Sequence, residues 1–158
     1  PIASAWATMR HYGCKGYEET VQQLMETTQY WRREIHAVDG VKVLGDPVMT
    51  IVSFASTNPK LNIYCVADVM EAKRGWHLER NLAPPSIHMT VMPPHAATKE
   101  QFVGDLKDAI KTVLANPAQY QKQGSAAMYG TVASIPDDAI VDKFLVQWMD
   151  KVYTGQDQ

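Results

Sequence analysis

The stretch GWHLERNLAPPSIHMTVMPP, from Gly75 to Pro94, joins a helix end, two strand-like runs and a proline-marked turn without interruption. Gly75 follows Lys73 and Arg74. This order is typical of a helix whose last turn carries cations at the negative end of the dipole and whose cap glycine is left-handed. The pattern therefore predicts a helix end at Gly75 and a strand that begins at Trp76.

A second strand is predicted after the Pro84-Pro85 pair. Proline cannot donate a backbone hydrogen bond and biases the preceding residue toward an extended conformation, so the pair marks a turn or a strand entry. Apolar residues then alternate with others in the run Ile87, His88, Met89, Thr90, Val91 and Met92. The alternation predicts a strand with one apolar face.

The chain begins with a helical pattern. Residues 2–12 and 17–38 carry apolar residues at spacings of three and four, and Gly13 and Gly16 weaken the pattern between them. The sequence predicts either one bent helix or two helices, with the end at Asp39-Gly40.

Two strands and a helix are predicted next. Residues 41–44 and 48–54 are rich in β-branched residues and flank a Gly-Asp-Pro turn, which predicts an antiparallel pair. Asn62 is placed to cap the helix that ends at Gly75.

Two more helices are predicted in the carboxyl-terminal part. Thr98 and Gln101 have the spacing of a capping box, which predicts a helix from Thr98 to residue 114. Residues 118–133 have little periodicity, so we expect a structured loop there. A final helix is expected to open near Ser134, Pro136 and Asp137, and to carry Val141, Phe144, Leu145, Trp148 and Val152 on one face.

This order of elements predicts an α+β fold. We expect a small, mainly antiparallel sheet with helices on one face. With 158 residues, of which 46% are hydrophobic, the chain can bury one sizeable core.

Net charge and cysteine content indicate which partners and which cellular compartment to expect. A formal net charge of -2 gives no electrostatic reason to expect nucleic acid or an anionic membrane surface. Cys14 and Cys65 lack metal-type spacing, which fits free thiols in a cytoplasmic or cytosol-facing location. No apolar run is long enough to predict a transmembrane helix. The start at Pro1-Ile2, inside an apolar helical run, is interpreted as a cut within a longer protein.

The residues do not predict a self-contained active site. No two of the histidines, His11, His36, His77, His88 and His95, have zinc-type helical spacing, and no metal site is expected. His88 is interpreted as a hydrogen-bonded core or sheet histidine. The motifs of serine hydrolases, phosphate-binding loops and dinucleotide-binding folds are absent from the sequence. The pairs Glu18-Glu19 and Asp137-Asp138 fit first helical turns, where acids favour the dipole, and Trp31 and Trp148 fit core positions.

One segment, GSAAMYG from Gly124 to Gly130, leaves both a structural and a functional role open. Small residues surround Tyr129 and permit close approach of a backbone or a ligand. Tyr129 could pack the predicted loop onto the body of the domain, which is the more common role, or it could serve a binding or catalytic site.

Several motifs, taken together, resemble the carboxyl-terminal part of the pyridoxal-phosphate (PLP)-dependent sphingosine-1-phosphate lyases, within the wider group of amino-acid decarboxylase-like enzymes. In chain order they are AWATMRHYGCKGYEE, LGDP, LNIYCVADVM, RGWHL, PPSIHMTV, the dipeptide NP and MYG. The resemblance covers essentially the whole chain. The combination of GWxL, PPSIH and a later YG is specific, whereas each piece alone is weak.

The resemblance implies the small carboxyl-terminal domain of a fold type I PLP enzyme, preceded by its long connecting helix. Residues 1–38 would form this connecting helical segment and residues 39–158 the small α+β domain. The full protein would be a homodimer that cleaves a phosphorylated sphingoid base to a long-chain aldehyde and phosphoethanolamine. PLP would be bound by a large domain that precedes this chain, because none of Lys15, Lys42, Lys73 and Lys99 lies in a matching motif. The resemblance therefore implies no cofactor-binding residue here and an isolated chain that is inactive.

Tyr129 is the one functional residue that the resemblance assigns. It matches the family tyrosine that reaches toward the active site, where it would contact substrate or transfer a proton. The chain departs from the family at Pro93-Pro94 and in the glutamine-rich residues 119–123.

Two alternatives remain beside the lyase. The chain could be a non-enzymatic α+β module for dimerisation or protein interaction. It could also be the same domain of a PLP-dependent amino-acid decarboxylase. The motif PPSIH, in place of an arginine-containing strand typical of decarboxylases, favours the lyase.

Overall fold

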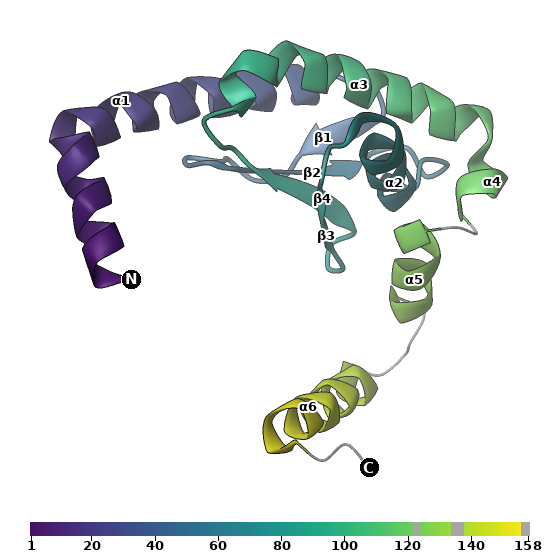
Figure 1. Cartoon of the computed structure of the whole chain (residues 1–158). Helices are drawn as coiled ribbons and strands as arrows, with labels where there is room; N and C mark the ends of the chain where they lie inside the picture. Colours follow the sequence, from purple (N-terminus) through teal and green to yellow (C-terminus); the bar gives the residue numbers. More distant parts are fainter. Residues whose placement is uncertain (122–123, 134–137, 156–158) are drawn as a thin grey trace.

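The computed structural model describes residues 1–121, 124–133 and 138–155, and the side chains of residues 1–121, 124–129 and 142–155. Its helices are α1 (Ile2–His36), α2 (Ile63–Arg74), α3 (His95–Ala115), α4 (Pro117–Gln121), α5 (Gly124–Ala133) and α6 (Asp138–Thr154). Its strands are β1 (Val41–Val43), β2 (Ile51–Ser56), β3 (Glu79–Asn81) and β4 (Ser86–Thr90) (Figure 1).

The strands form one antiparallel sheet in the order β1-β2-β4-β3. Helices α2 and α3 lie along one side of this sheet, and the second part of α1 contacts β1, β2 and α3 (Figure 1). The α+β fold with a small antiparallel sheet, preceded by a long helix, is therefore confirmed.

The register of the sheet decides which side chains face the helices. Phe54 lies opposite Ile87 on β4, and Ile87 lies opposite Arg80 on β3. Because directly opposed residues project to the same face of a sheet, Arg80 points toward the helices that bury Phe54 and Ile87.

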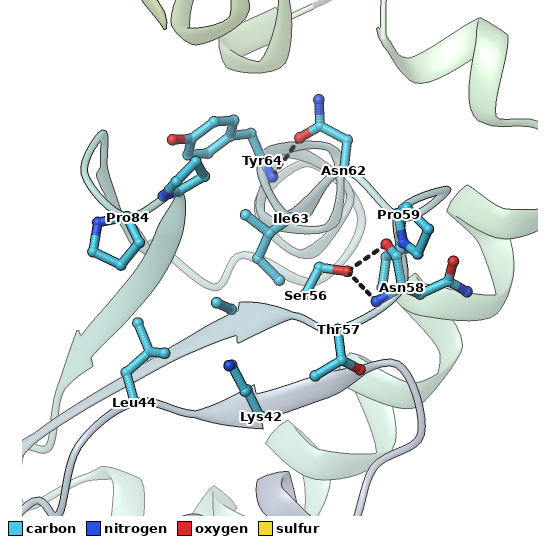
Figure 2. Close-up of a pocket in the computed structure, with 13 residues that line it drawn as sticks. Lys42, Leu44, Ser56, Thr57, Asn58, Pro59, Asn62, Ile63, Tyr64 and Pro84 are labelled. Atoms are coloured by element: carbon cyan, nitrogen blue, oxygen red, sulfur yellow. Dashed lines mark hydrogen bonds between the residues drawn. The ribbon is translucent and has the colours of Figure 1, made fainter.

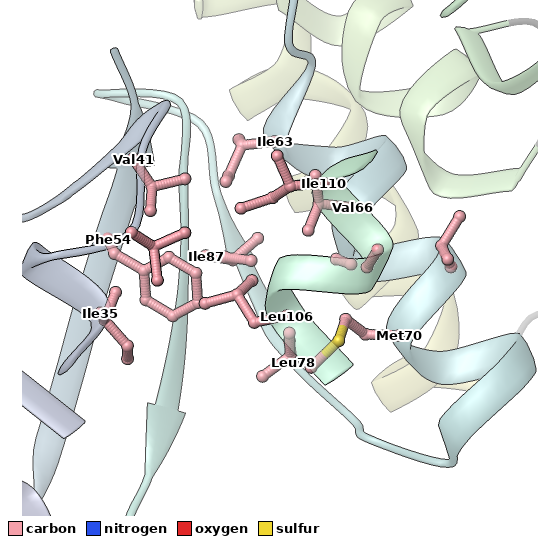
Figure 3. Close-up of a cluster of buried hydrophobic side chains, with 14 of the residues drawn as sticks. Ile35, Val41, Phe54, Ile63, Val66, Met70, Leu78, Ile87, Leu106 and Ile110 are labelled. Atoms are coloured by element: carbon pink, nitrogen blue, oxygen red, sulfur yellow. The ribbon is translucent and has the colours of Figure 1, made fainter. Parts of the chain in front are cut away.

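The core lies between the sheet and the helices. Figure 3 shows side chains from α1, α2, α3 and the strands β1, β2 and β4 meeting there. Among them, Ile35, Phe54, Val66, Met70, Ile87 and Leu106 are each 1% exposed or less. The predicted alternation is confirmed, since Ile87, Met89 and Val91 are buried.

Two tryptophans tie the helices together. The Nε1–H of Trp31 on α1 donates to the carbonyl of Lys99 at 3.0 Å, and that of Trp76 donates to Oδ2 of Asp105 at 2.9 Å. Both rings contact Phe102, with centroid distances of 4.5 and 5.1 Å. A buried indole thus packs and also satisfies a polar group. The core position predicted for Trp31 is confirmed.

Both predicted caps of α2 are confirmed. The side chain of Asn62 accepts a hydrogen bond from the Tyr64 amide at 2.9 Å, and Gly75 has φ 75° in the left-handed region. Of the two alternatives left open for the first helical region, the structure shows one bent helix. Gly13, with φ 60° and ψ -177°, breaks the helical geometry inside α1, and Figure 1 shows the bend.

The predicted first residues of three elements were wrong. Helix α3 begins at His95 because Pro93 and Pro94 open it, so Thr98 lies inside the helix and no side-chain cap forms. Strand β3 begins at Glu79 instead of Trp76, whose side chain turns toward Asp105. Strand β2 begins at Ile51 instead of residue 48.

The segment predicted as a loop over residues 118–133 is largely helical where the structure describes it. Helix α4 ends at Gln121, and α5 starts at Gly124 with φ 63°. The small residues of α5 have little apolar periodicity, so the sequence did not indicate a helix. Contact with α2 stabilises this helix.

The final helix is present, but its apolar face is not covered. The predicted opening residues 134–137 and the side chain of Val141 lie outside the described residues. On α6, Phe144, Leu145, Trp148 and Val152 are 66%, 49%, 53% and 56% exposed, so the core position predicted for Trp148 was wrong. Among the described helices, none combines the length and apolar character needed to cross a membrane.

Replacement of the buried tryptophan tests the packing of α1 on α3. Trp31→Phe removes the hydrogen bond to Lys99 and leaves a cavity, so we expect the free energy of unfolding to fall by about 2 kcal/mol. Urea denaturation followed by circular dichroism measures this loss. Trp6→Phe is the matched control, because Trp6 is 63% exposed and its replacement should change stability by less than about 0.5 kcal/mol. Equal effects of the two substitutions would contradict the assignment.

Candidate functional site

Tyr129 lies on α5, at the place where this helix packs against α2. Its side chain is partly buried, and its ring centroid lies 5.0 Å from that of Tyr64 on α2, with an interplanar angle of 32°. The packing role that physics favours is therefore observed. The functional role stays a prediction. It requires a phenol that can form further hydrogen bonds, and a partly exposed phenol keeps this capacity.

A cluster of polar groups holds the start of α5. Oδ1 of Asp68 on α2 accepts hydrogen bonds from Nη2 of Arg80 at 2.7 Å and from Oγ of Ser125 at 2.5 Å. Oδ2 of the same carboxylate accepts from the Ala126 amide at 3.2 Å. We call these groups, the side chains of Asp68, Arg80 and Ser125 with the Ala126 amide, the Asp68 cluster.

Arg80 links the edge of the sheet to both helices of this cluster. Its Nε donates to Oγ of Ser125 at 2.7 Å, and its Nη2 also contacts Oε2 of Glu71 at 3.0 Å. The side chain is only 14% exposed. Burial alone would lower the pKa of Arg80, but the hydrogen bonds and charges of Asp68 and Glu71 raise it above its ordinary value. The guanidinium therefore stays charged.

Tyr64 forms the wall between Tyr129 and a neighbouring cleft. Its hydroxyl donates to the carbonyl of Asn81 on β3 at 2.6 Å. Burial, and then the nearby Tyr129, raise the pKa of Tyr64. Tyr64 therefore stays a neutral phenol whose position is fixed at both ends, by α2 and by β3.

The cleft beside Tyr64 has a volume of about 720 Å³ and lies over the amino end of α2. Figure 2 shows Leu44, Ile63 and Pro84 on its walls together with Lys42 and Ser56. The hydroxyl of Ser56 is engaged with the backbone of Asn58 at 2.8 and 3.1 Å. These contacts hold the loop before α2 in place and occupy the Ser56 hydroxyl.

The remaining candidates do not gather into a site. Among the residues that the structure describes, no three His, Cys, Asp or Glu side chains are arranged to hold a metal ion. His88 is a half-buried residue of β4 opposite Ser53 and Glu79, consistent with the interpretation as a sheet histidine. Glu19 pairs with Lys15 at 3.7 Å on the surface of α1. Asp137 lies outside the described residues.

Sequence reasoning missed Asp68, Arg80 and Ser125. A signal for them existed, because Asp68 interrupts the apolar run of α2 and Arg80 lies on a strand beside buried Leu78. Opposite charges at such positions indicate a partly buried ion pair. Their pairing depends on the sheet register, which local patterns did not fix.

Comparison of the sequence with known proteins identifies relatives of this chain. No protein-family model matches the chain. The curated sphingosine-1-phosphate lyase of Oryza sativa subsp. japonica is 40% identical over 149 residues, which make up 94% of this chain and 27% of the relative. The corresponding lyase of Arabidopsis thaliana is 36% identical over 152 residues, which make up 96% of this chain and 27% of the relative. The chain is homologous to the carboxyl-terminal part of sphingosine-1-phosphate lyases. It spans about a quarter of the length of these relatives.

Solved structures agree with this assignment. The sphingosine-1-phosphate lyase of Burkholderia pseudomallei superposes with a TM-score of 0.66 and 28% identity, over 86% of this chain and 29% of that one. Lactobacillus brevis glutamate decarboxylase, at 18% identity, matches 69% of this chain and 27% of its own with a TM-score of 0.61. A C-DES variant with glycine linked to its PLP cofactor, also at 18% identity, matches 63% of this chain and 26% of its own with a TM-score of 0.53. The last two show a shared fold.

The two cysteines provide a test of the packing around α2. Burial, and then the carboxylate of Asp68, raise the pKa of the Cys65 thiol to about 11, whereas Cys14 is exposed on α1. At pH 8 the thiolate fraction of Cys65 is roughly one in a thousand. We expect Ellman's reagent to label one thiol rapidly in the native protein and the second only after unfolding. Cys14→Ser should abolish the rapid phase, and rapid labelling of both thiols would contradict the buried position of Cys65.

Proposed function

We propose that this chain forms the carboxyl-terminal region of a PLP-dependent sphingosine-1-phosphate lyase. The reaction is the cleavage of a phosphorylated sphingoid base to a long-chain aldehyde and phosphoethanolamine. The 40% identity to the rice lyase, maintained along 94% of the chain, carries this proposal. In it, residues 1–38 form a connecting helical segment and residues 39–158 the small domain. The free thiols Cys14 and Cys65 fit a cytosol-facing location.

The described residues do not fit a complete PLP site. A lysine that forms a Schiff base in such a site is held inside it, whereas every described lysine is exposed or half-buried. We therefore assign PLP to a large domain elsewhere in a longer protein. PLP supplies the electron sink for cleavage of a carbon–carbon bond, and the protein orients the substrate and moves protons.

Tyr129 is the group that this chain contributes. Its ring is held against Tyr64 at 5.0 Å, and its helix is held by the Asp68 cluster. In the proposal its phenol contacts the substrate or transfers a proton during cleavage. The isolated chain is then inactive, because it supplies one wall of a site completed by the large domain.

A homodimer of the full protein belongs to the same proposal. Helix α1 exposes Trp6, Met9 and Tyr12 before the bend at Gly13, and Val21 after it, at 63%, 55%, 48% and 46%, which is unusual for a helix that ends in a core. These side chains support burial against another part of the protein or a second subunit. They also support the competing proposal of a non-enzymatic interaction module. The decarboxylase alternative has the weaker support, since its structural match is 18% identical.

The function is tested on the longer protein that contains this chain. We expect stoichiometric PLP, measured by absorbance, and release of a long-chain aldehyde from sphingosine 1-phosphate. The 158 residues alone should show neither. Stoichiometric PLP on the 158 residues alone would contradict the assignment of the cofactor to a large domain. A longer protein without PLP would favour the interaction module, and release of CO2 from an amino acid would favour the decarboxylase.

Replacement of Tyr129 tests its role in this function. Tyr129→Phe in the complete protein should lower kcat roughly 100-fold while PLP absorbance and thermal stability stay near those of the unaltered protein, because only the hydroxyl is lost. Tyr120→Phe is the matched control, since Tyr120 on α4 is also a partly buried phenol packed on the core. Unchanged kinetics for Tyr129→Phe would return this residue to a packing role.

A further inference from the structure

We propose that Asp68, Arg80 and Ser125 are positioning residues for Tyr129, and that the charge of Asp68 fixes α5 on α2 in the geometry that the reaction needs. This proposal rests on the proposed function of Tyr129 and adds residues to which no role is assigned by the family resemblance. Three features of the Asp68 cluster support it. The cluster contacts the same face of α5 as Tyr129, three donors surround the Asp68 carboxylate, and Gly124 lies next to that carboxylate.

The cluster and Tyr129 lie on the same face of α5. Ser125 and Tyr129 are four residues apart, about one helical turn, so a contact at Ser125 sets the direction of Tyr129. Ala126, between them in sequence, is 2% exposed. The Tyr64 ring receives Tyr129 at 5.0 Å. Polar contacts therefore fix one turn of the helix, and ring packing fixes the next.

The donors around Asp68 require a carboxylate. Arg80 and Ser125 donate to Oδ1, and the Ala126 amide donates to Oδ2. Both oxygens thus act only as acceptors, so an asparagine must place its NH2 group against at least one donor. The negative charge also lies at the amino end of α5, where the helix dipole favours it, and beside the guanidinium of Arg80. Asp68→Asn is consequently a severe change despite its similar size.

Gly124 allows the carboxylate to come this close. It has φ 63°, and a Cβ added there would lie 2.6 Å from Oδ2 of Asp68. A side chain at this position would displace the carboxylate or the helix. Gly45 has a similar φ of 65° with nothing within 4 Å of an added Cβ. The pair Gly124 and Gly45 separates the effect of crowding at Asp68 from the effect of backbone conformation alone.

Hydrogen exchange measures attachment of α5 directly. In the complete protein, Asp68→Asn and Gly124→Ala should raise amide exchange in residues 124–133 by roughly tenfold or more, while residues 63–74 keep their protection. Ser125→Ala, which removes a single hydroxyl, is a milder variant for use if Asp68→Asn fails to fold. The matched controls are Gly45→Ala and Asp108→Asn, since Asp108 is 60% exposed and also pairs with an arginine, Arg74. Neither control should change exchange in residues 124–133.

Kinetics show whether this attachment serves Tyr129. Asp68→Asn should lower kcat by about as much as Tyr129→Phe, with KM changed less than roughly threefold, and the double substitution should lower kcat no further. Unchanged exchange in residues 124–133 would overturn the attachment. Raised exchange with unchanged kcat would overturn the positioning role and leave the proposed function intact, provided that Tyr129→Phe lowers kcat. If Tyr129→Phe is fully active, the proposed role of Tyr129 fails, and positioning for catalysis fails with it.

Discussion

The antiparallel register between β2 and β4 is the constraint on which the rest of this structure depends. It places Phe54 opposite Ile87 under the helices. The next pairing places Arg80 on the same face, against α2. A shift of one residue would turn these side chains to the opposite face. The charge of Arg80 would then leave Asp68 and Glu71, and α5 would lose one of the groups that attach it.

The sheet register therefore places the partly buried guanidinium of Arg80 beside α2, where it and Asp68 together hold α5. Asp68 is 22% exposed and Arg80 14%, so water screens their attraction less than it would on the surface. Removal of Arg80 would leave Asp68 without its guanidinium partner next to the core, whereas removal of Asp68 would leave Arg80 paired with Glu71. The arrangement favours one position of α5 over others, which suits the role proposed for Tyr129.

Local patterns predicted the parts of the fold that local chemistry controls. The Asn62 cap, the left-handed Gly75 and the alternation of Ile87, Met89 and Val91 follow from rules that act within a few residues. The helix start at His95 was missed because Pro93 and Pro94 outcompete the capping box at Thr98. Residues 118–133 were missed because α5 is stabilised by long-range contacts with α2. The role of Tyr129 is a prediction from the family resemblance, whereas the contacts of Asp68, 57 positions before Ser125, required the tertiary structure.

The central claim is that α5 presents Tyr129 to a PLP site completed by another part of a longer protein. Homology to sphingosine-1-phosphate lyases over 94% of the chain supports it. The most direct measurement is a structure of the complete protein with PLP and a nonreactive analogue of the phosphorylated sphingoid base. The account predicts the Tyr129 hydroxyl within hydrogen-bond reach of the analogue or the cofactor, about 2.6–3.2 Å or through one water. A Tyr129 hydroxyl far from both, with α5 still attached at Asp68, would contradict it.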